Sequence, residues 1–160
     1  MKEAEKNATK SKSRLAINLT LLGVCFTIFA LIISLNPDLL KNNVLLAVQL
    51  TLAIPLLITS IFARTTLGYT KKPKIWNKFG FVTFMLAYSF LVNVIGLLLD
   101  NLINFKIAIL FYGVNIFLAF TYSYMEIKGD DYKIKRRIKK DLIFISILLI
   151  GGILPSLGVY

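Results

Sequence analysis

The chain alternates between long stretches without a charged residue and short stretches rich in charge. Five uncharged stretches of 23, 22, 21, 19 and 19 residues cover Leu15–Pro37, Asn42–Ala63, Phe79–Leu99, Ile107–Met125 and Leu142–Tyr160. A helix of about 20 apolar residues crosses the hydrocarbon core of a bilayer. Backbone groups in lipid must form their hydrogen bonds within the protein, which favours helices. The pattern therefore predicts an all-α, polytopic integral membrane protein with five transmembrane helices.

We expect these helices over residues 15–35, 44–63, 79–99, 106–125 and 142–158. Residues 1–14 are polar and rich in lysine, without apolar periodicity, and are interpreted as a cytoplasmic basic tail. The uncharged stretches take up most of the 160 residues, so little remains for a soluble domain. Residues 15–160 are therefore expected to form a single transmembrane domain.

The distribution of charge predicts the orientation of the chain. If the chain crosses the membrane at every stretch, one side receives 17 of the 19 Lys and Arg residues and the whole net charge of +11. The opposite side holds Lys41 and Lys106 against Asp38 and Asp100. Because cytoplasmic segments carry the excess of Lys and Arg, the N-terminus is expected in the cytoplasm and the C-terminus outside. Orientation explains the charge, so no nucleic acid is expected as a partner.

The residue types present argue against most catalytic and metal chemistry. The chain is 57% hydrophobic, has a single cysteine, Cys25, and contains no histidine, which is the commonest general base and metal ligand near neutral pH. None of the five stretches contains an acidic or basic residue, the usual mark of proton relays and ion pathways. We expect no cofactor, no metal and no enzymatic activity, and an integral membrane enzyme is the least favoured class.

Uncharged polar residues on the helix faces are the first candidate site. Helical periodicity selects five of them: Gln49, Ser89, Asn93, Tyr112 and Asn115. In one interpretation their side chains form hydrogen bonds between neighbouring helices, worth about 0.6 kcal/mol each on average. In the other they line an uncharged polar cavity or pore that opens outward and suits a neutral solute or a partner helix.

The basic connector before the last stretch is the second candidate site. Its six cations are Lys133, Lys135, Arg136, Arg137, Lys139 and Lys140. Basic residues near the surface of an anionic membrane contribute about 1 kcal/mol each to binding. The connector therefore either sets the topology and binds lipid headgroups, or docks an acidic cytoplasmic partner.

Small residues also share one face of the first predicted helix. These are Gly23, Thr27, Ala30 and Ser34. A stripe of small side chains lets two helices approach closely in lipid.

Five helices enclose little interior, and an odd number prevents two symmetric halves. Function is therefore expected to need a protein partner or a homo-oligomer, in contact with anionic lipid. The first interpretation is a non-enzymatic accessory, assembly or immunity-type component of a membrane complex. The alternative is a small transporter or channel subunit that forms an uncharged polar pathway by self-association. Richness in Lys, Ile and Asn indicates an AT-rich prokaryotic genome, and hence the cell membrane of a prokaryote.

Overall fold

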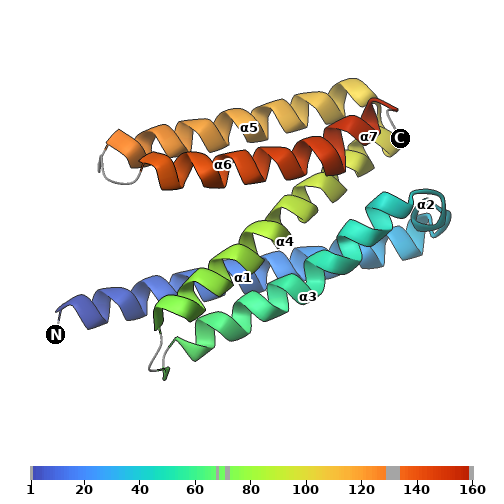
Figure 1. The fold of residues 1–160 in the computed structure, drawn as a ribbon. Helices are drawn as coiled ribbons and strands as arrows, with labels where there is room; N and C mark the ends of the chain where they lie inside the picture. Colours follow the sequence, from blue (N-terminus) through green and yellow to red (C-terminus); the bar gives the residue numbers. More distant parts are fainter. Residues whose placement is uncertain (1, 68, 71–72, 129–133, 159–160) are drawn as a thin grey trace. The chain divides into compact units, whose positions relative to one another are not determined.

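The structure is a computed structural model that describes residues 2–67, 69–70, 73–128 and 134–158. Side chains are described for these residues except 2–11, 126–128 and 135–136. All regular structure in this part of the chain is helical (Figure 1). The elements are α1 (Lys2–Leu35), α2 (Asp38–Asn42), α3 (Val44–Thr66), α4 (Pro73–Leu102), α5 (Phe105–Lys128), α6 (Ile134–Leu148), the π-helical η2 (Leu149–Ile153) and α7 (Leu154–Ser156). The all-α prediction is confirmed.

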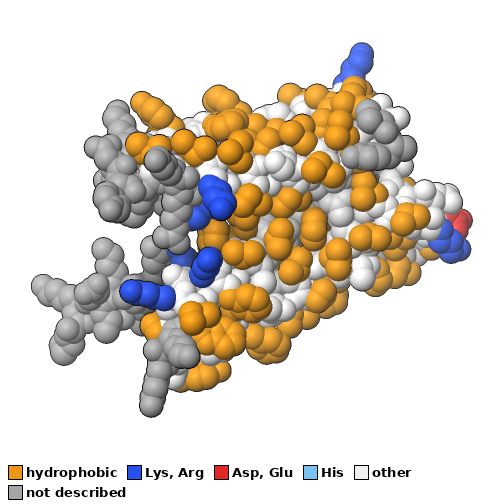
Figure 2. Space-filling view, viewed as in Figure 1, with side chains coloured by type: hydrophobic (Ala, Val, Ile, Leu, Met, Phe, Trp, Pro, Cys, Tyr) orange, Lys and Arg blue, Asp and Glu red, His pale blue; other side chains and the backbone are white. Residues whose placement is uncertain are grey.

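Among the residues that the structure describes, four helices are long and apolar enough to cross a membrane. Their qualifying segments are Lys12–Leu35, Val44–Thr66, Pro73–Leu102 and Phe105–Met125. They coincide with the first four predicted helices. On the face shown in Figure 2, hydrophobic side chains cover the middle of the helices, and the Lys and Arg side chains that are drawn lie toward the helix ends. This distribution is compatible with insertion into a bilayer.

The fifth predicted helix, over 142–158, is divided into three shorter elements. α6 already begins at Ile134 and ends at Leu148, and η2 and α7 follow without a break. Pro155 has no amide hydrogen for the carbonyl four residues earlier. The N–H of Leu154 donates to the carbonyl of Leu149, five residues back, which is the π-helical pattern. None of the three elements reaches the length of a membrane span, so the structure does not confirm a fifth crossing.

Like α6, the helices α1 and α4 begin several residues earlier than predicted. α1 begins at Lys2, so residues of the predicted tail continue the helix. The segment 2–14 is rich in Lys, Glu and Ala, which favour helices even without an apolar face. α4 begins at Pro73 rather than at residue 79. Proline suits the first turn of a helix, because its missing amide hydrogen would have no partner there.

The chain forms two compact units, Met1–Leu91 and Val92–Tyr160. α4 contributes residues 73–91 to the first unit and residues 92–102 to the second. In the first unit α1 and α3 lie side by side (Figure 1). α1 buries Asn18, Cys25 and Ile32, which are spaced by two helical turns. On α4, a Cβ atom added to Gly80 would lie 2.9 Å from the Cβ of Ala63, so this glycine permits close packing of α4 on α3.

Asparagine side chains cap the N-terminal ends of two of the long helices. The Oδ1 of Asn43 accepts from the N–H of Leu46 at 3.0 Å at the start of α3. The Oδ1 of Asn104 accepts from the N–H of Ile107 at 3.0 Å at the start of α5. Both bonds satisfy amide hydrogens that have no partner within the helix. In the second unit, α5 and α6 then lie side by side (Figure 1).

Candidate functional site

Two of the predicted polar residues meet in the interior of the second unit. Asn93 on α4 and Tyr112 on α5 are both buried. The hydroxyl of Tyr112 donates to the backbone carbonyl of Asn93 at 3.2 Å. The Nδ2 of Asn93 donates to the backbone carbonyl of Ile147 on α6 at 3.0 Å. These two bonds connect three helices, and we call the pair the Asn93–Tyr112 centre.

Two glycines make room for the Tyr112 ring. A Cβ atom on Gly96 of α4 would overlap with the ring and its hydroxyl. A Cβ atom on Gly152 of η2 would overlap with the same hydroxyl and would lie 2.6 Å from Asn93 Oδ1. The ring therefore lies between α4 and the π-helical turn. Isolated π-helical turns are frequent at functional sites, so this centre is the candidate functional site of the second unit.

The other three residues predicted for a polar cavity have different surroundings. Gln49 and Ser89 are buried and belong to the first unit. The hydroxyl of Ser89 donates to the carbonyl of Met85 in its own helix at 2.8 Å. Asn115 is half-buried, and its Nδ2 donates to the carbonyl of Phe111 in its own helix at 2.9 Å. Within the second unit, the structure brings Asn93 and Tyr112 of the predicted set together.

In the basic connector, Arg137 takes part in helix packing. Its Nε donates to the hydroxyl of Ser123 on α5 at 2.9 Å and lies 3.6 Å from a carboxylate oxygen of Asp141. Its guanidinium also lies over the ring of Tyr122, 4.6 Å from the ring centroid. Arg137 therefore fastens the start of α6 to the end of α5.

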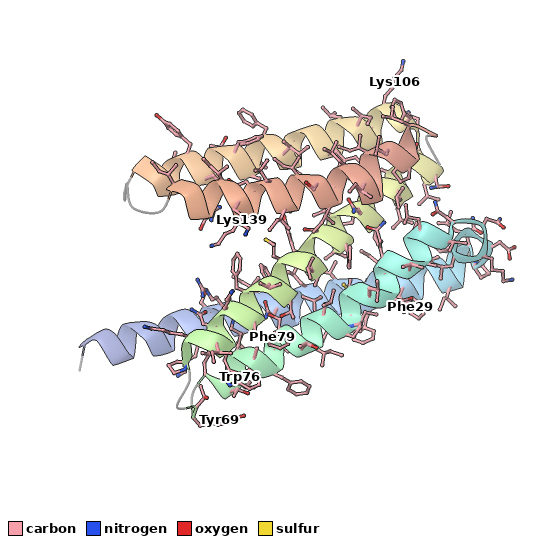
Figure 3. The ribbon with its side chains drawn as sticks, in the orientation of Figure 1. Phe29, Tyr69, Trp76, Phe79, Lys106 and Lys139 are labelled. Carbon is pink, nitrogen blue, oxygen red and sulfur yellow. The ribbon has the colours of Figure 1, made fainter. Side chains whose placement is uncertain are left out.

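Two further cations of that connector have described side chains on α6. Lys139 is exposed and Lys140 is half-buried on α6 (Lys139 is labelled in Figure 3). Lys133 lies outside the described residues, as do the side chains of Lys135 and Arg136.

The first unit contains a polar centre that the sequence reasoning missed. The Nδ2 of Asn18 on α1 donates to the hydroxyl of Ser60 on α3 at 2.8 Å. That hydroxyl donates to the backbone carbonyl of Gly80 on α4, also at 2.8 Å. Asn18 and Ser60 are polar residues near the same end of two antiparallel apolar stretches. That common depth is the signal that could have paired them.

Beside this centre, two arginines converge on one asparagine. Arg64 on α3 is 5% exposed, and its Nη1 donates to Oδ1 of Asn77 on α4 at 2.6 Å. The Nη1 of Arg14 on α1 donates to the same oxygen at 3.4 Å. We call these residues the Arg14–Arg64–Asn77 cluster. The sequence placed all three at the edges of apolar stretches, but nothing in it indicated that they meet.

Over the part of the chain that the structure describes, the architecture is all-helical, with four helices of membrane-spanning length and a buried polar centre in each unit. Among the residues that the structure describes, no three His, Cys, Asp or Glu side chains are placed to hold a metal ion. Comparison with protein-family models, with curated proteins and with solved structures finds no match to the chain. Function is therefore inferred from these sites alone.

Proposed function

We propose that this chain is a non-enzymatic, multi-pass membrane protein that acts as an accessory, assembly or immunity-type component of a membrane complex. The observation that carries the proposal is where the buried polar side chains form their hydrogen bonds. Asn18, Ser60 and Asn93 each bond to a neighbouring helix. A solute pathway needs polar groups turned toward an opening, whereas these groups hold helices together. The interhelical interpretation of the polar residues is therefore preferred.

The exposed face of α1 offers a surface for a partner helix. Gly23, Thr27, Ala30 and Ser34 are all exposed, and a Cβ atom on Gly23 would meet nothing within 4 Å. The hydroxyl of Thr27 donates to the carbonyl of Gly23 at 3.0 Å, within the helix. Small side chains make few contacts with lipid tails, but they allow another helix to pack closely against this face. This stripe supports association with a second membrane protein.

The proposal includes five membrane crossings, with α6, η2 and α7 together as the fifth. The N-terminus is cytoplasmic, the C-terminus is outside, and the membrane is the cell membrane of a prokaryote. Support comes from the placement of 17 of 19 cations on one side and from the uncharged stretch after Asp141. Anionic lipid headgroups would contact the cytoplasmic cations.

The test is the mass of the complex recovered from native membranes in mild detergent with a tagged chain. We expect one unrelated membrane protein in a constant ratio. The Gly23→Leu variant should lose this protein, because the larger side chain blocks close approach. The matched control is Gly113→Leu on α5, another exposed glycine whose added Cβ would meet nothing within 4 Å. Both variants should keep the thermal stability of the parent protein.

A homo-oligomer without other proteins would contradict the proposal. Combined with flux of a neutral solute in liposomes, it would establish the alternative, a transporter or channel subunit that forms its pathway by self-association. Recovery of the chain as a monomer would reject both functions.

A further inference from the structure

One edge of α5 carries a line of side chains with the spacing of a coiled-coil seam. Phe111, Asn115, Leu118, Tyr122 and Met125 are separated by steps of four, three, four and three residues. This spacing places them on one line along the helix, as it does the a and d positions of a heptad repeat. Leu118, Tyr122 and Met125 are 57%, 61% and 70% exposed, and the other two residues are half-buried. Much of this line is therefore accessible to another helix, and we call the five residues the α5 seam.

The polar member of the seam, Asn115, lies in the middle of a membrane-length segment. It is the central residue of the 21 residues Phe105–Met125. At 1.5 Å per residue it lies about 15 Å from either end of that segment. Its Nδ2 donates to the carbonyl of Phe111 in its own helix at 2.9 Å. Within the part of the chain that the structure describes, its Oδ1 accepts no hydrogen bond. The amide therefore presents an acceptor oxygen at a depth where lipid offers no hydrogen-bond donor.

A second copy of the same chain meets the requirements of this seam. Copies inserted in one orientation place Asn115 at the same depth, so a two-fold axis along the membrane normal brings the two amides together. An amide is self-complementary, because each Nδ2 has a second hydrogen to donate to the Oδ1 of the other copy. A different protein would have to supply a polar group at this same depth. A single asparagine in such a seam also fixes the register and the number of the paired helices.

We propose that α5 pairs in parallel with α5 of a second copy along the α5 seam, with reciprocal hydrogen bonds between the two Asn115 amides. Phe111 and Leu118 lie about one helical turn away on either side and shield the amides from lipid. The stripe of small residues on α1 is a different surface. A complex that contains two copies of this chain together with a partner protein is therefore compatible with both proposals, and neither depends on the other.

The first test is oxidative cross-linking of the full chain in native membranes, with Leu118→Cys in a Cys25→Ala background that has no other cysteine. We expect a disulfide-linked homodimer, because seam positions face their own copies across the two-fold axis. The matched control is Phe120→Cys, which is 54% exposed and lies about 200° further round the same helix. This variant should remain monomeric. Absence of a dimer for Leu118→Cys would overturn the proposal, as would equal cross-linking of Phe120→Cys or linkage of Leu118→Cys to a different protein.

The second test asks whether the amide holds the dimer together. Cross-linking of Leu118→Cys is measured in liposomes at increasing ratios of lipid to protein. Asn115→Leu should weaken dimerisation about tenfold, the scale of hydrogen bonds between membrane helices, and Asn115→Gln, which keeps the amide, should weaken it less. The matched control is Asn101→Leu on α4, which removes an exposed amide that donates to the Leu97 carbonyl of its own helix at 2.7 Å. It should dimerise like the parent protein. Parent-like dimerisation of Asn115→Leu, or an equal loss in Asn101→Leu, would overturn the proposal, and the first test stands even if Asn115→Leu does not fold.

Discussion

At the residue scale, the side chain of Tyr112 is confined on two sides in the second unit. Its ring lies against Gly96 and Gly152, and any side chain at either glycine would occupy the space of the phenol. Protein interiors are close-packed, so an added methyl group displaces its neighbours. The two glycines are therefore required by packing rather than by backbone conformation.

We predict that Gly96→Ala and Gly152→Ala each lower the free energy of unfolding by about 1–3 kcal/mol, the usual cost of overpacking a core. Thermal unfolding in detergent would measure this loss. Gly113→Ala is the matched control, because its Cβ would meet nothing within 4 Å. Removal of a helical glycine stabilises by about 0.5–1 kcal/mol, so the control should unfold at a slightly higher temperature. Parent-like stability of Gly96→Ala would show that Tyr112 does not occupy this position.

A second residue-scale prediction concerns Ser60. Ser60→Ala removes the acceptor for Asn18 and the donor for the Gly80 carbonyl. The Gly80 carbonyl still accepts from the Thr83 hydroxyl at 3.4 Å, whereas leaving the buried Asn18 amide without its Ser60 acceptor costs about 1–3 kcal/mol. Thr59→Val is the control, because the Thr59 hydroxyl donates only to the Pro55 carbonyl of its own helix, at 2.7 Å. Unfolding in a denaturing detergent should shift for Ser60→Ala and stay within about 0.5 kcal/mol for Thr59→Val. Equal shifts would contradict the proposed connection.

Sequence reasoning identified part of these sites. Helical periodicity singled out Asn93 and Tyr112 because long polar residues inside an uncharged stretch are conspicuous. It missed the contact between Asn18 and Ser60, since periodicity assigns a residue to a face but does not say which helix that face meets. It also missed the meeting of Arg14 and Arg64, which are 50 positions apart in the sequence. Contacts between helices depend on packing order, which a single sequence does not reveal.

At the element scale, α5 and α6 are joined by Arg137 at the end where the chain passes between them. The residue bonds to Ser123, approaches Asp141 and stacks on Tyr122. The side chains of Arg137 and Asp141 are each 16% exposed, so solvent screens this ion pair only in part. One cation thus contributes both to the charge of the connector and to its structure.

We predict that Arg137→Lys destabilises the α5–α6 hairpin by about 1 kcal/mol, since lysine keeps the charge but not the planar donors that stack and bond. Hydrogen exchange at residues 134–141 would report faster opening. Lys139→Gln removes a charge from an exposed position of the same helix and should leave exchange unchanged. A larger increase in exchange for Lys139→Gln than for Arg137→Lys would contradict the prediction, because the charge of the connector would then stabilise the hairpin more than the contacts of Arg137 do.

Helix existence was easier to predict than helix ends. The uncharged stretches predicted the four membrane-length helices found in the described part of the chain. The early starts of α1 and α4 depend on local propensity in charged segments, where hydropathy gives no signal. The division of 142–158 coincides with Gly151, Gly152 and Pro155, which weaken a regular α-helix because glycine has low helix propensity and proline lacks an amide hydrogen. Composition alone does not predict that a π-helical hydrogen-bond pattern replaces the α-helical one in this segment.

At the scale of the whole molecule, the number of crossings determines on which side the chain ends. Four crossings would return residue 157 to the side of the N-terminus, whereas five would place it on the opposite side. The connector at residues 133–140 follows the fourth helix and is cytoplasmic in both cases, so its cations do not distinguish them; the uncharged stretch of 19 residues after Asp141 favours five crossings. Against this, α6, η2 and α7 form no single helix of spanning length.

Labelling of single cysteines distinguishes these topologies. Cys25 is the only native cysteine, so the Cys25→Ala variant is a cysteine-free background into which single cysteines can be introduced. In intact cells, a membrane-impermeant thiol reagent should label Asn36→Cys and Leu157→Cys but not Tyr69→Cys. All three positions are exposed in the structure, so access to the reagent depends on the membrane. Tyr69→Cys should react once the cells are permeabilised. Protection of Leu157→Cys together with labelling of Asn36→Cys would establish four crossings, and the three C-terminal elements would then lie on the cytoplasmic side with the basic connector.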